Sequence, residues 1–353
     1  MKWNEMKWNE MKWNEMKWIK TIEFIIIIES SESSESYRIV WMLRRFSRIN
    51  STPHYIVDDD VIPHEEYQYL NLIHDIIEQN HEHDGRNGTT LSVFGAAMVF
   101  SLDQGRIPIL TTKQMAWKTC LKELLWFIRG KTDNRLLQDA GVHIWDDNAS
   151  RDFLESRGLS HYADGDLGPV YGHQWRHFNA TYSTCEADYT GKGVDQLSEI
   201  IRCLKHPVER FSRRLIMSAW NPCQLNEMAL PPCHILCQFN VDNQNRLSCA
   251  LYQRSGDVGL GVPFNIASYS FLTHLLAKHC GLVAHEFVYH LGNAHIYDDH
   301  VDILRTRQLQ MKPFAFPQVE IGTLRDDINS YVLEDFRITD YRCHSTLKMT
   351  MRK

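Results

Sequence analysis

The stretch from Met228 to Asn265 constrains this chain more than any other, because it places reactive side chains at the ends of two strand-like runs. The first run, PPCHILCQFNV, brings Cys233 directly after a rigid Pro-Pro pair, which fixes the backbone ahead of the thiol. The second run leads into RSGD, where Arg254 and Asp257 flank a Ser-Gly turn, and Asn265 opens a helical pattern. A thiol, a guanidinium, a carboxylate and an amide in one stretch indicate a covalent nucleophile beside an anionic ligand.

The chemistry of these side chains narrows the reaction class. The thiolate is the reactive form of cysteine, and we expect the guanidinium of Arg254 to lower the pKa of Cys233. Arginine also matches phosphate oxygens, and the Asn265 amide can read a heterocycle edge that shows one donor and one acceptor. His234 follows the thiol, but adjacent residues on a strand point to opposite faces, so His234 is poorly placed as a base for Cys233. The sequence thus predicts attack on a phosphorylated heterocycle, against the alternative that Cys233 is a small buried hydrophobic residue.

Length and composition limit the class of protein. With 353 residues, of which 43% are hydrophobic, the chain can bury a large core, and its net charge of −6 argues against a broad nucleic-acid footprint. Nine cysteines without CxxC spacing argue against a disulfide framework or a metal site, and favour a reducing compartment. We therefore expect a cytoplasmic location, with a nuclear one left open. The apolar segment at 22–28 is too short to span a membrane, and no signal peptide is expected.

Residues 1–62 read as a low-complexity, disordered N-terminal extension. It holds three MKWNE repeats, an acidic Ser-rich linker at 30–36, and a basic segment from Arg38 to Ile49. That segment could contact RNA or a membrane surface, although a frayed appendage is the favoured interpretation. The folded domain is expected at 63–353.

Periodicity predicts an α+β (mixed α/β) single domain with a large twisted sheet covered by helices. Apolar residues at helical spacing predict helices at 64–79, 114–129, 194–206 and 268–281. Strands are expected at 91–102, with Gly95 as a bulge or close contact, and at 215–220, whereas polar 81–88 reads as a loop. No Gly-rich dinucleotide turn is present in the sequence.

Several long motifs resemble the folate-dependent thymidylate synthase family. They are GRNGTTLSVFG, KELLWFIRG, HIWD, GDLGPVYGHQWRHF, SRRLIMSAWNP, PPCHILCQF, YQRSGDVGLGVPFNIASYS and GNAHIY, in family order over roughly 63–353. The resemblance implies reductive methylation of dUMP to dTMP, with 5,10-methylenetetrahydrofolate as cosubstrate, dihydrofolate as by-product and no metal. It also implies an obligate homodimer whose sheets pack back to back and whose active sites are shared.

The resemblance also assigns roles to individual residues. The implied catalytic residues are the nucleophile Cys233, Glu123 acting through ordered water, Tyr171 near proton removal, Asn265 and Asp257. The implied dUMP contacts are Arg86, Arg213, Arg214, Arg254, Ser255, Gly256, Asp257, Asn265, His295 and Tyr297, with Arg213 and Arg214 reaching from the partner subunit. The implied folate contacts are Trp145, Asp257, Gly261 and Phe264.

Departures from the family pattern concern folate more than the reaction type. Asn293 stands where Asp is usual, Ala116 replaces a bulky aromatic residue, and Arg352-Lys353 stand where small apolar residues normally close over folate. We expect these two cations to attract the anionic glutamate tail of folate and to loosen the lid. Two alternatives stay open: a pyrimidine nucleotide hydroxymethylase on the same fold, and a catalytically impaired homologue that binds nucleotide or RNA. Asn265 favours uracil over cytosine.

Overall fold

The structure is a computed structural model that describes residues 64–85 and 88–352. The predictions made for the N-terminal extension, for Arg86 and for Lys353 lie outside these ranges. The chain divides into two units, residues 1–63 and residues 64–353, and the second holds the sheet, the helices and every other residue assigned a role.

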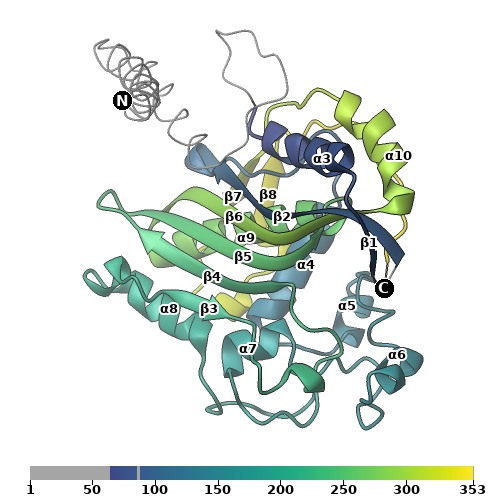
Figure 1. Ribbon diagram of the computed structural model, residues 1–353. Coiled ribbons are helices and arrows are strands. Elements are labelled where there is room, and N and C mark those ends of the chain that lie inside the picture. The colour runs from purple at the N-terminus through teal and green to yellow at the C-terminus, as the bar shows by residue number, and fades with distance from the viewer. Residues whose placement is uncertain (1–63, 86–87, 353) are drawn as a thin grey trace, which may run out of the picture. The chain divides into compact units, whose positions relative to one another are not determined.

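One six-stranded sheet forms the centre of this unit, in the order β1-β2-β6-β5-β4-β3 (Figure 1). The strands are β1 (Glu82–Gly85), β2 (Gly88–Ser101), β3 (Ile216–Ser218), β4 (His234–Val241), β5 (Arg246–Asp257) and β6 (Val283–Tyr297). All neighbours pair antiparallel except β5 and β6, which are parallel and joined by α9 (Gly261–Cys280). A parallel pair requires such a crossover, and it brings the ends of β5 and β6 to the same sheet edge as the start of α9.

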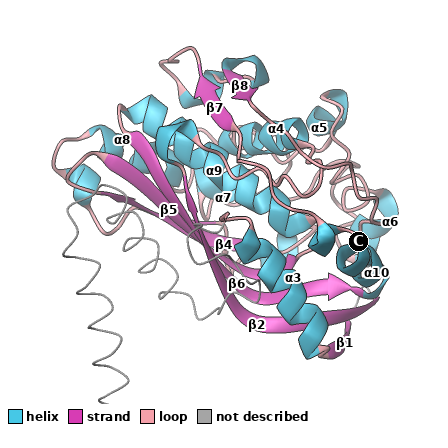
Figure 2. Ribbon diagram, turned by 90° about the horizontal axis from the view of Figure 1, so that it is seen from above, coloured by secondary structure: helices cyan, strands magenta, loops and turns pink. Residues whose placement is uncertain are grey.

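Helices cover one face of the sheet (Figure 2). Helix α9 is apolar on nearly every side, which is the pattern of a fully buried helix, and it packs on β5 and β6. Around it α4 (Trp117–Ile128) packs on α9, α3 (Tyr67–Gln79) on β2, and α8 (Gln196–Lys205) on β3. The remaining elements are α5 (Arg135–Asp139), α6 (Arg151–Ser156), α7 (Tyr171–His177), α10 (Asp298–Thr306), and a two-stranded sheet of β7 (Gln318–Ile321) and β8 (Phe336–Thr339). The predicted mixed α/β fold with a helix-covered sheet is confirmed.

Three local predictions were wrong. Part of the expected loop at 81–88 is strand β1, whose side chains are all exposed, so that no apolar alternation marks it in the sequence. Gly95 is neither a bulge nor a close contact, because the β2–β6 register continues unchanged from Phe94 to Ala96 and a Cβ there would meet nothing within 4 Å. Its φ of +84° is what favours glycine. Helix α9 begins at Gly261, one turn before Asn265.

Candidate active site

Cys233 lies immediately before β4, where the backbone is fixed from both sides. Its N–H donates to the Tyr171 hydroxyl at 2.8 Å, and its carbonyl accepts from the Arg254 N–H at 2.9 Å. The pairing of β4 with β5 then shifts register between His234 and Leu236. This irregularity separates the cysteine from the regular ladder and places the thiol beside β5.

The two prolines before Cys233 orient the guanidinium of Arg254 toward the thiol. Its Nε donates to the Pro232 carbonyl at 2.8 Å, and its Nη2 donates to the Pro231 carbonyl at 3.0 Å and lies 3.8 Å from Sγ of Cys233. Burial nevertheless raises the pKa of the Cys233 thiol, and the nearby Arg254 charge opposes that rise without reversing it. Arg254 thus acts in the expected direction, but the net pKa is raised because the cost of burying a thiolate exceeds the attraction of one guanidinium.

His234 has a role that the sequence did not reveal, since it holds the amide of Asn265. Its Nε2 lies 3.3 Å from Nδ2 of Asn265, its Nδ1 lies 3.2 Å from the Tyr269 hydroxyl, and its ring stacks on Tyr171 at 4.3 Å. Burial lowers the pKa of His234 to about 3, so the imidazole is neutral and can accept from Asn265. The carbonyl and the second N–H of Asn265 remain for a ligand. Strand alternation predicted that the His234 side chain points away from that of Cys233. Only the fold shows that Asn265, in the first turns of α9, lies where His234 can contact it.

Glu123, Trp145 and Tyr171 form a continuous wall beside this cluster. The indole N–H of Trp145 donates to Oε1 of Glu123 at 2.7 Å, and the Trp145 and Tyr171 rings lie 6.1 Å apart. Burial raises the pKa of Glu123 to about 7, which the bond from Trp145 only partly opposes. A carboxyl group with this pKa can both give and accept a proton near neutral pH.

Asp257 and His295 are register partners at the ends of the parallel strands β5 and β6. Nδ1 of His295 lies 2.9 Å from Oδ1 of Asn293, so the side chain that departs from the family pattern still supplies an acceptor oxygen. Burial lowers the pKa of His295, which keeps the ring neutral, and the Tyr297 ring meets it edge-on at 5.4 Å. His295 and Tyr297 thus present their side chains together at the end of β6.

Two further charged residues support Asp257, and sequence reasoning missed both. Fully buried His300 lies between Asp257 and the chain end, with Nδ1 3.8 Å from Oδ1 of Asp257 and Nε2 2.8 Å from the Thr350 carbonyl. Lys113 donates its ammonium to the Gly259 carbonyl, and burial lowers the pKa of Lys113 to about 8. A TTK triplet and an isolated His are weak signals, because only the fold brings them to Asp257.

Arg352 ties the C-terminal segment to the start of α10. Nη2 of Arg352 lies 3.1 Å from a carboxylate oxygen of Asp298 and 3.0 Å from one of Asp299, at the start of α10, and the guanidinium lies 5.8 Å from the Tyr297 ring. Two carboxylates of the same chain therefore pair with Arg352, and the expected attraction of the anionic tail of folate stays a prediction. Lys353 lies outside the described residues.

The remaining ligand-contact candidates lie around the turn between β5 and α9. The Ser255 hydroxyl is half-buried and forms no hydrogen bond with the residues that the structure describes. A Cβ on Gly256 would come within 2.8 Å of the Leu291 and Val262 side chains, so glycine is required there by close packing. Gly261 starts α9, and Phe264 is partly buried one turn into it.

Arg213 and Arg214 are not part of this cluster. They occupy an exposed turn just before β3, the edge strand of the sheet, so the bend that two adjacent residues need to serve one ligand is present. Their guanidinium groups form neither hydrogen bonds nor ion pairs with any residue between 64 and 352 for which the structure gives a position.

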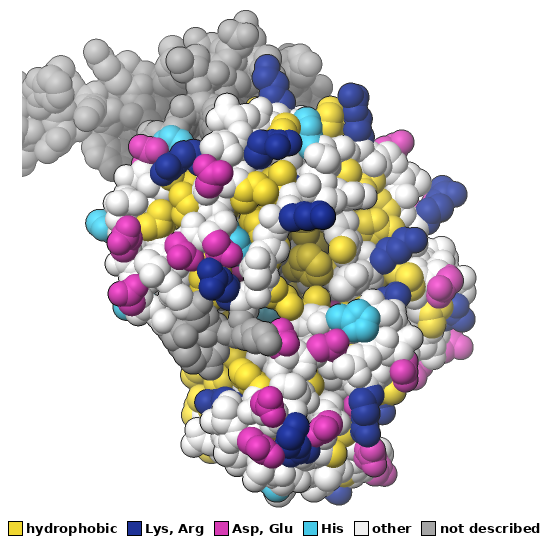
Figure 3. All heavy atoms as spheres, turned by 90° about the vertical axis from the view of Figure 1, so that its right-hand side faces the viewer, with side chains coloured by type: hydrophobic (Ala, Val, Ile, Leu, Met, Phe, Trp, Pro, Cys, Tyr) yellow, Lys and Arg dark blue, Asp and Glu magenta, His cyan; other side chains and the backbone are white. Residues whose placement is uncertain are grey.

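Figure 1 shows α5, α6 and α10 on one side of the molecule, and the space-filling view of that side is hollowed (Figure 3). In Figure 3 hydrophobic side chains form the floor of the hollow, and basic and acidic side chains stand around it. Within the described ranges, no group of three or more His, Cys, Asp or Glu side chains is arranged to hold a metal ion, and no helix has the length and apolarity to cross a membrane.

The fold and the cysteine-centred site agree with the comparisons with known proteins. The thymidylate synthase family model matches residues 67–353, and the chain belongs to this family. It is 52% identical over 290 residues to the thymidylate synthase of Homo sapiens, covering 82% of this chain and 91% of the human protein. Thymidylate synthase of human herpesvirus 8 type P is 52% identical over 290 residues, covering 82% and 85%.

Other relatives are longer proteins. The bifunctional dihydrofolate reductase-thymidylate synthase of Zea mays is 52% identical over 289 residues, which cover 82% of this chain and 54% of that protein. The chain thus spans about half the length of the bifunctional relatives it matches.

Proposed function

We propose that this protein converts dUMP to dTMP by reductive methylation, with residues 63–353 as the catalytic domain. One observation carries the proposal: Arg254 contacts the Cys233 thiol, Tyr171 accepts from the Cys233 backbone N–H, and the next residue, His234, contacts the Asn265 amide. Residues in or next to α7, β4, β5 and α9 thus supply a candidate nucleophile, a cation suited to phosphate, and an amide that can hydrogen-bond the edge of a base.

The described side chains match the three parts of dUMP. Arg254 and the unpartnered Ser255 hydroxyl suit the phosphate, for which charge-assisted bonds are strongest. The free N–H and carbonyl of Asn265 suit O4 and N3–H of uracil. His295 and Tyr297 suit the 3′-hydroxyl of the ribose. Arg86, outside the described residues, is proposed as a further phosphate ligand, and Gly256 as the close-packed backbone between these groups.

Cys233 forms the covalent bond in the proposed mechanism. Its thiolate adds to C6 of the uracil ring, and the electron pair of the C5–C6 double bond moves toward C5 and O4, where an Asn265 N–H stabilises the charge. Because burial raises the pKa of Cys233, the resting thiol is protonated, and its proton passes to solvent water before the thiolate adds to C6. Glu123, with a pKa of about 7, and Tyr171, whose hydroxyl stays protonated because burial raises its pKa, are the groups placed to move protons at O4 and C5.

The residues present also fit 5,10-methylenetetrahydrofolate. Trp145 and Phe264 supply aromatic surface for a fused ring, and Asp257, 18% exposed and steadied by Gly259 and His300, supplies an anionic acceptor for ring N–H groups. Gly261 leaves the start of α9 open beside them. When bound, folate supplies the one-carbon unit and the hydride that completes the methyl group. The protein's part is to hold the ring against Trp145 and to exclude water.

We further propose a homodimer formed through the uncovered face of the sheet. Ile216 and Tyr252 are large side chains on β3 and β5 that remain 45% and 40% exposed, although they belong to sheet strands. Exposed apolar surface of this kind marks an interface. The same packing would bring Arg213 and Arg214, whose guanidinium groups have no partner among the described residues, to the phosphate of the neighbouring subunit. All nine cysteines are free, which supports a reducing compartment such as the cytoplasm.

The test is incubation of the purified protein with dUMP and methylenetetrahydrofolate. Dihydrofolate absorbance and the nucleotide product are followed in the same reaction. We expect dTMP and dihydrofolate in equal amounts. Hydroxymethyl-dUMP without dihydrofolate would instead identify a hydroxymethylase, and tight dUMP binding without any product would identify an impaired homologue.

A further inference from the structure

A second cavity lies apart from the Cys233 site. It encloses about 430 Å³ and is lined by Arg129, Gly130, Lys131, Thr132, Arg176, His177, Cys185, Ala187, Asp188, Tyr189, Thr190 and Asn329. None of these residues belongs to the proposed catalytic or ligand-binding set. The cavity joins the turn after α4, the end of α7 and the segment at 185–190.

Two guanidinium groups converge at this cavity on one residue. Nε of Arg129 donates to the Asn329 carbonyl at 3.1 Å, and Nη1 of Arg176 donates to Oδ1 of Asn329 at 2.5 Å. Between them Gly130, at a φ of +70°, is so close to Arg176 that a Cβ would lie 3.1 Å from its Cγ. Lys131 follows directly and is exposed at the cavity.

The charges of this group are incompletely balanced. Asp195 pairs with Arg176 at 3.0 Å through both oxygens, whereas Arg129 donates only to the uncharged carbonyls of Asn329 and Tyr331. The Lys131 ammonium forms no hydrogen bond or ion pair in the described part of the chain. Asp188 is the one carboxylate among the described lining residues, so an excess of positive charge faces the cavity.

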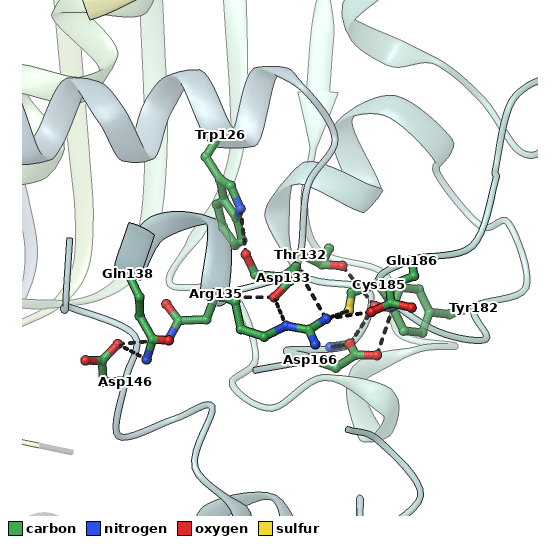
Figure 4. A network of polar contacts seen from close by, with 12 residues as sticks. Trp126, Thr132, Asp133, Arg135, Gln138, Asp146, Asp166, Tyr182, Cys185 and Glu186 are labelled. Atoms are coloured by element: carbon green, nitrogen blue, oxygen red, sulfur yellow. Dashed lines mark hydrogen bonds and ion pairs between the residues drawn. The ribbon is translucent and has the colours of Figure 1, made fainter. Parts of the chain in front are cut away.

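Two nearby carboxylates, those of Asp133 and Glu186, are directed to another arginine and not to Arg129 or Lys131. Figure 4 shows Arg135 between Asp133 and Glu186, with its Nη2 2.9 Å and 2.8 Å from their carboxylates. Asp166 accepts from the Tyr182 hydroxyl at 2.6 Å and from the Cys185 N–H at 2.9 Å. This network also fixes the cavity wall, so a ligand would meet a preformed site.

We propose that this cavity binds a small oxyanion, a phosphate group in the first place, through Arg129 and Lys131. Arginine presents a fork of donors that matches a phosphate or carboxylate, and lysine adds a point charge. The inference does not depend on the catalytic function proposed above, since no residue is shared between the two sites.

The test uses the full-length protein, with and without dUMP, titrated with inorganic phosphate, with citrate, and with potassium chloride at matched ionic strength. Binding is read from the rise in Tm and from 31P line broadening. We expect phosphate to raise the Tm above the chloride curve in both conditions. Lys131→Glu breaks no side-chain hydrogen bond or ion pair among the described residues, so it should fold normally and weaken phosphate binding about tenfold or more.

The matched control is Lys278→Glu, which alters an exposed lysine in the last turn of α9 and should bind phosphate like the wild type. Stronger binding of citrate than of phosphate, lost in Lys131→Glu, would keep the site and assign it to carboxylates. Phosphate and chloride curves that coincide would overturn the proposal. So would equal phosphate binding by the wild type and Lys131→Glu.

Discussion

Two regions differ in whether their polar and charged side chains have partners in the described chain. They are the cluster around Cys233 and the turn that carries Arg213 and Arg214. In the first, each side chain is held by another: Arg254 by two proline carbonyls, Asn265 by His234, and Glu123 by Trp145. In the second, both guanidinium groups are exposed and without a partner in the described chain. In the first region the described chain itself orients the side chains, whereas in the second it does not, as the proposed homodimer would predict.

Removing the nucleophile of the first region should produce the largest effect, a loss of turnover. Cys233→Ala should reduce kcat by at least about 10³-fold, because no other group can form the covalent bond, while dUMP binding persists through Arg254 and Asn265. Turnover and equilibrium binding are measured separately. Cys223→Ala, at an exposed cysteine, is the control and should remain active. Comparable activity of both variants would remove Cys233 from the mechanism.

Mixing two inactive variants tests whether the second region serves another subunit. Cys233→Ala subunits and Arg214→Glu subunits should each be inactive alone. A mixed dimer contains one site with an intact cysteine and an intact partner arginine, so a 1:1 mixture should regain about a quarter of wild-type activity. Subunit exchange is verified with differently tagged chains. If exchange occurs without any recovery, Arg214 acts within its own chain or not at all.

The base preference tests the amide that His234 holds. Asn265→Asp replaces a donor-acceptor pair with two acceptors, so activity on dCMP relative to dUMP should rise about tenfold or more. The ratio of kcat/KM for the two nucleotides is the measurement. His234→Ala should lower kcat/KM for dUMP without this change in preference. An unchanged ratio in Asn265→Asp would show that the base is read by other groups.

Burial of Glu123 predicts a pH dependence of stability with a defined sign. Its pKa is about 7 in the folded chain and 4.5 when exposed, so between these values the folded state holds a proton that the unfolded state has released. This contribution to stability is therefore present below about pH 4.5 and is lost as the pH rises toward 7. Glu123→Gln removes the effect and should gain a few degrees in Tm relative to wild type between pH 5 and pH 8. A Tm difference that is independent of pH would contradict the raised pKa.

The ion pairs of Arg352 should give the smallest effect, because the guanidinium is partly exposed. Arg352→Ala breaks the ion pairs that hold the chain end against α10, so it should raise the KM for folate about twofold at low salt and leave dUMP affinity unchanged. Addition of salt should raise the wild-type KM toward that of the variant. Arg337→Ala, which breaks an exposed pair with Glu320 in the small sheet, is the control and should leave both constants unchanged.

The sequence predicted the helices that bury an apolar stripe. It did not predict an element whose side chains are all exposed, or contacts between residues far apart in the chain. Helices α3, α4 and α8 were expected from their spacing, whereas β1 has no buried side chain and gave no signal. The resemblance singled out Cys233, Arg254 and Asn265, and the fold brings them together. It did not reveal that His234 orients Asn265 or that His300 and Lys113 flank Asp257, because those contacts join residues 30 to 150 positions apart. The raised pKa of Cys233 and the pairing of Arg352 depend on burial and on neighbours that alternation alone cannot supply.

The position of β6 in the sheet has a consequence for how the chain is made. This strand comes last of the six in the sequence yet lies between β2 and β5, so that Phe94 pairs with Asn293 across almost two hundred residues. On the ribosome, the edge of β2 that β6 will cover has no strand to pair with until residue 297 has been synthesised. The nascent protein should therefore expose an unpaired strand for most of its synthesis, and chains that stop before β6 should aggregate or require chaperones. Because the parallel pairing of β5 with β6 also depends on this last strand, we expect the sheet to be completed only late in synthesis.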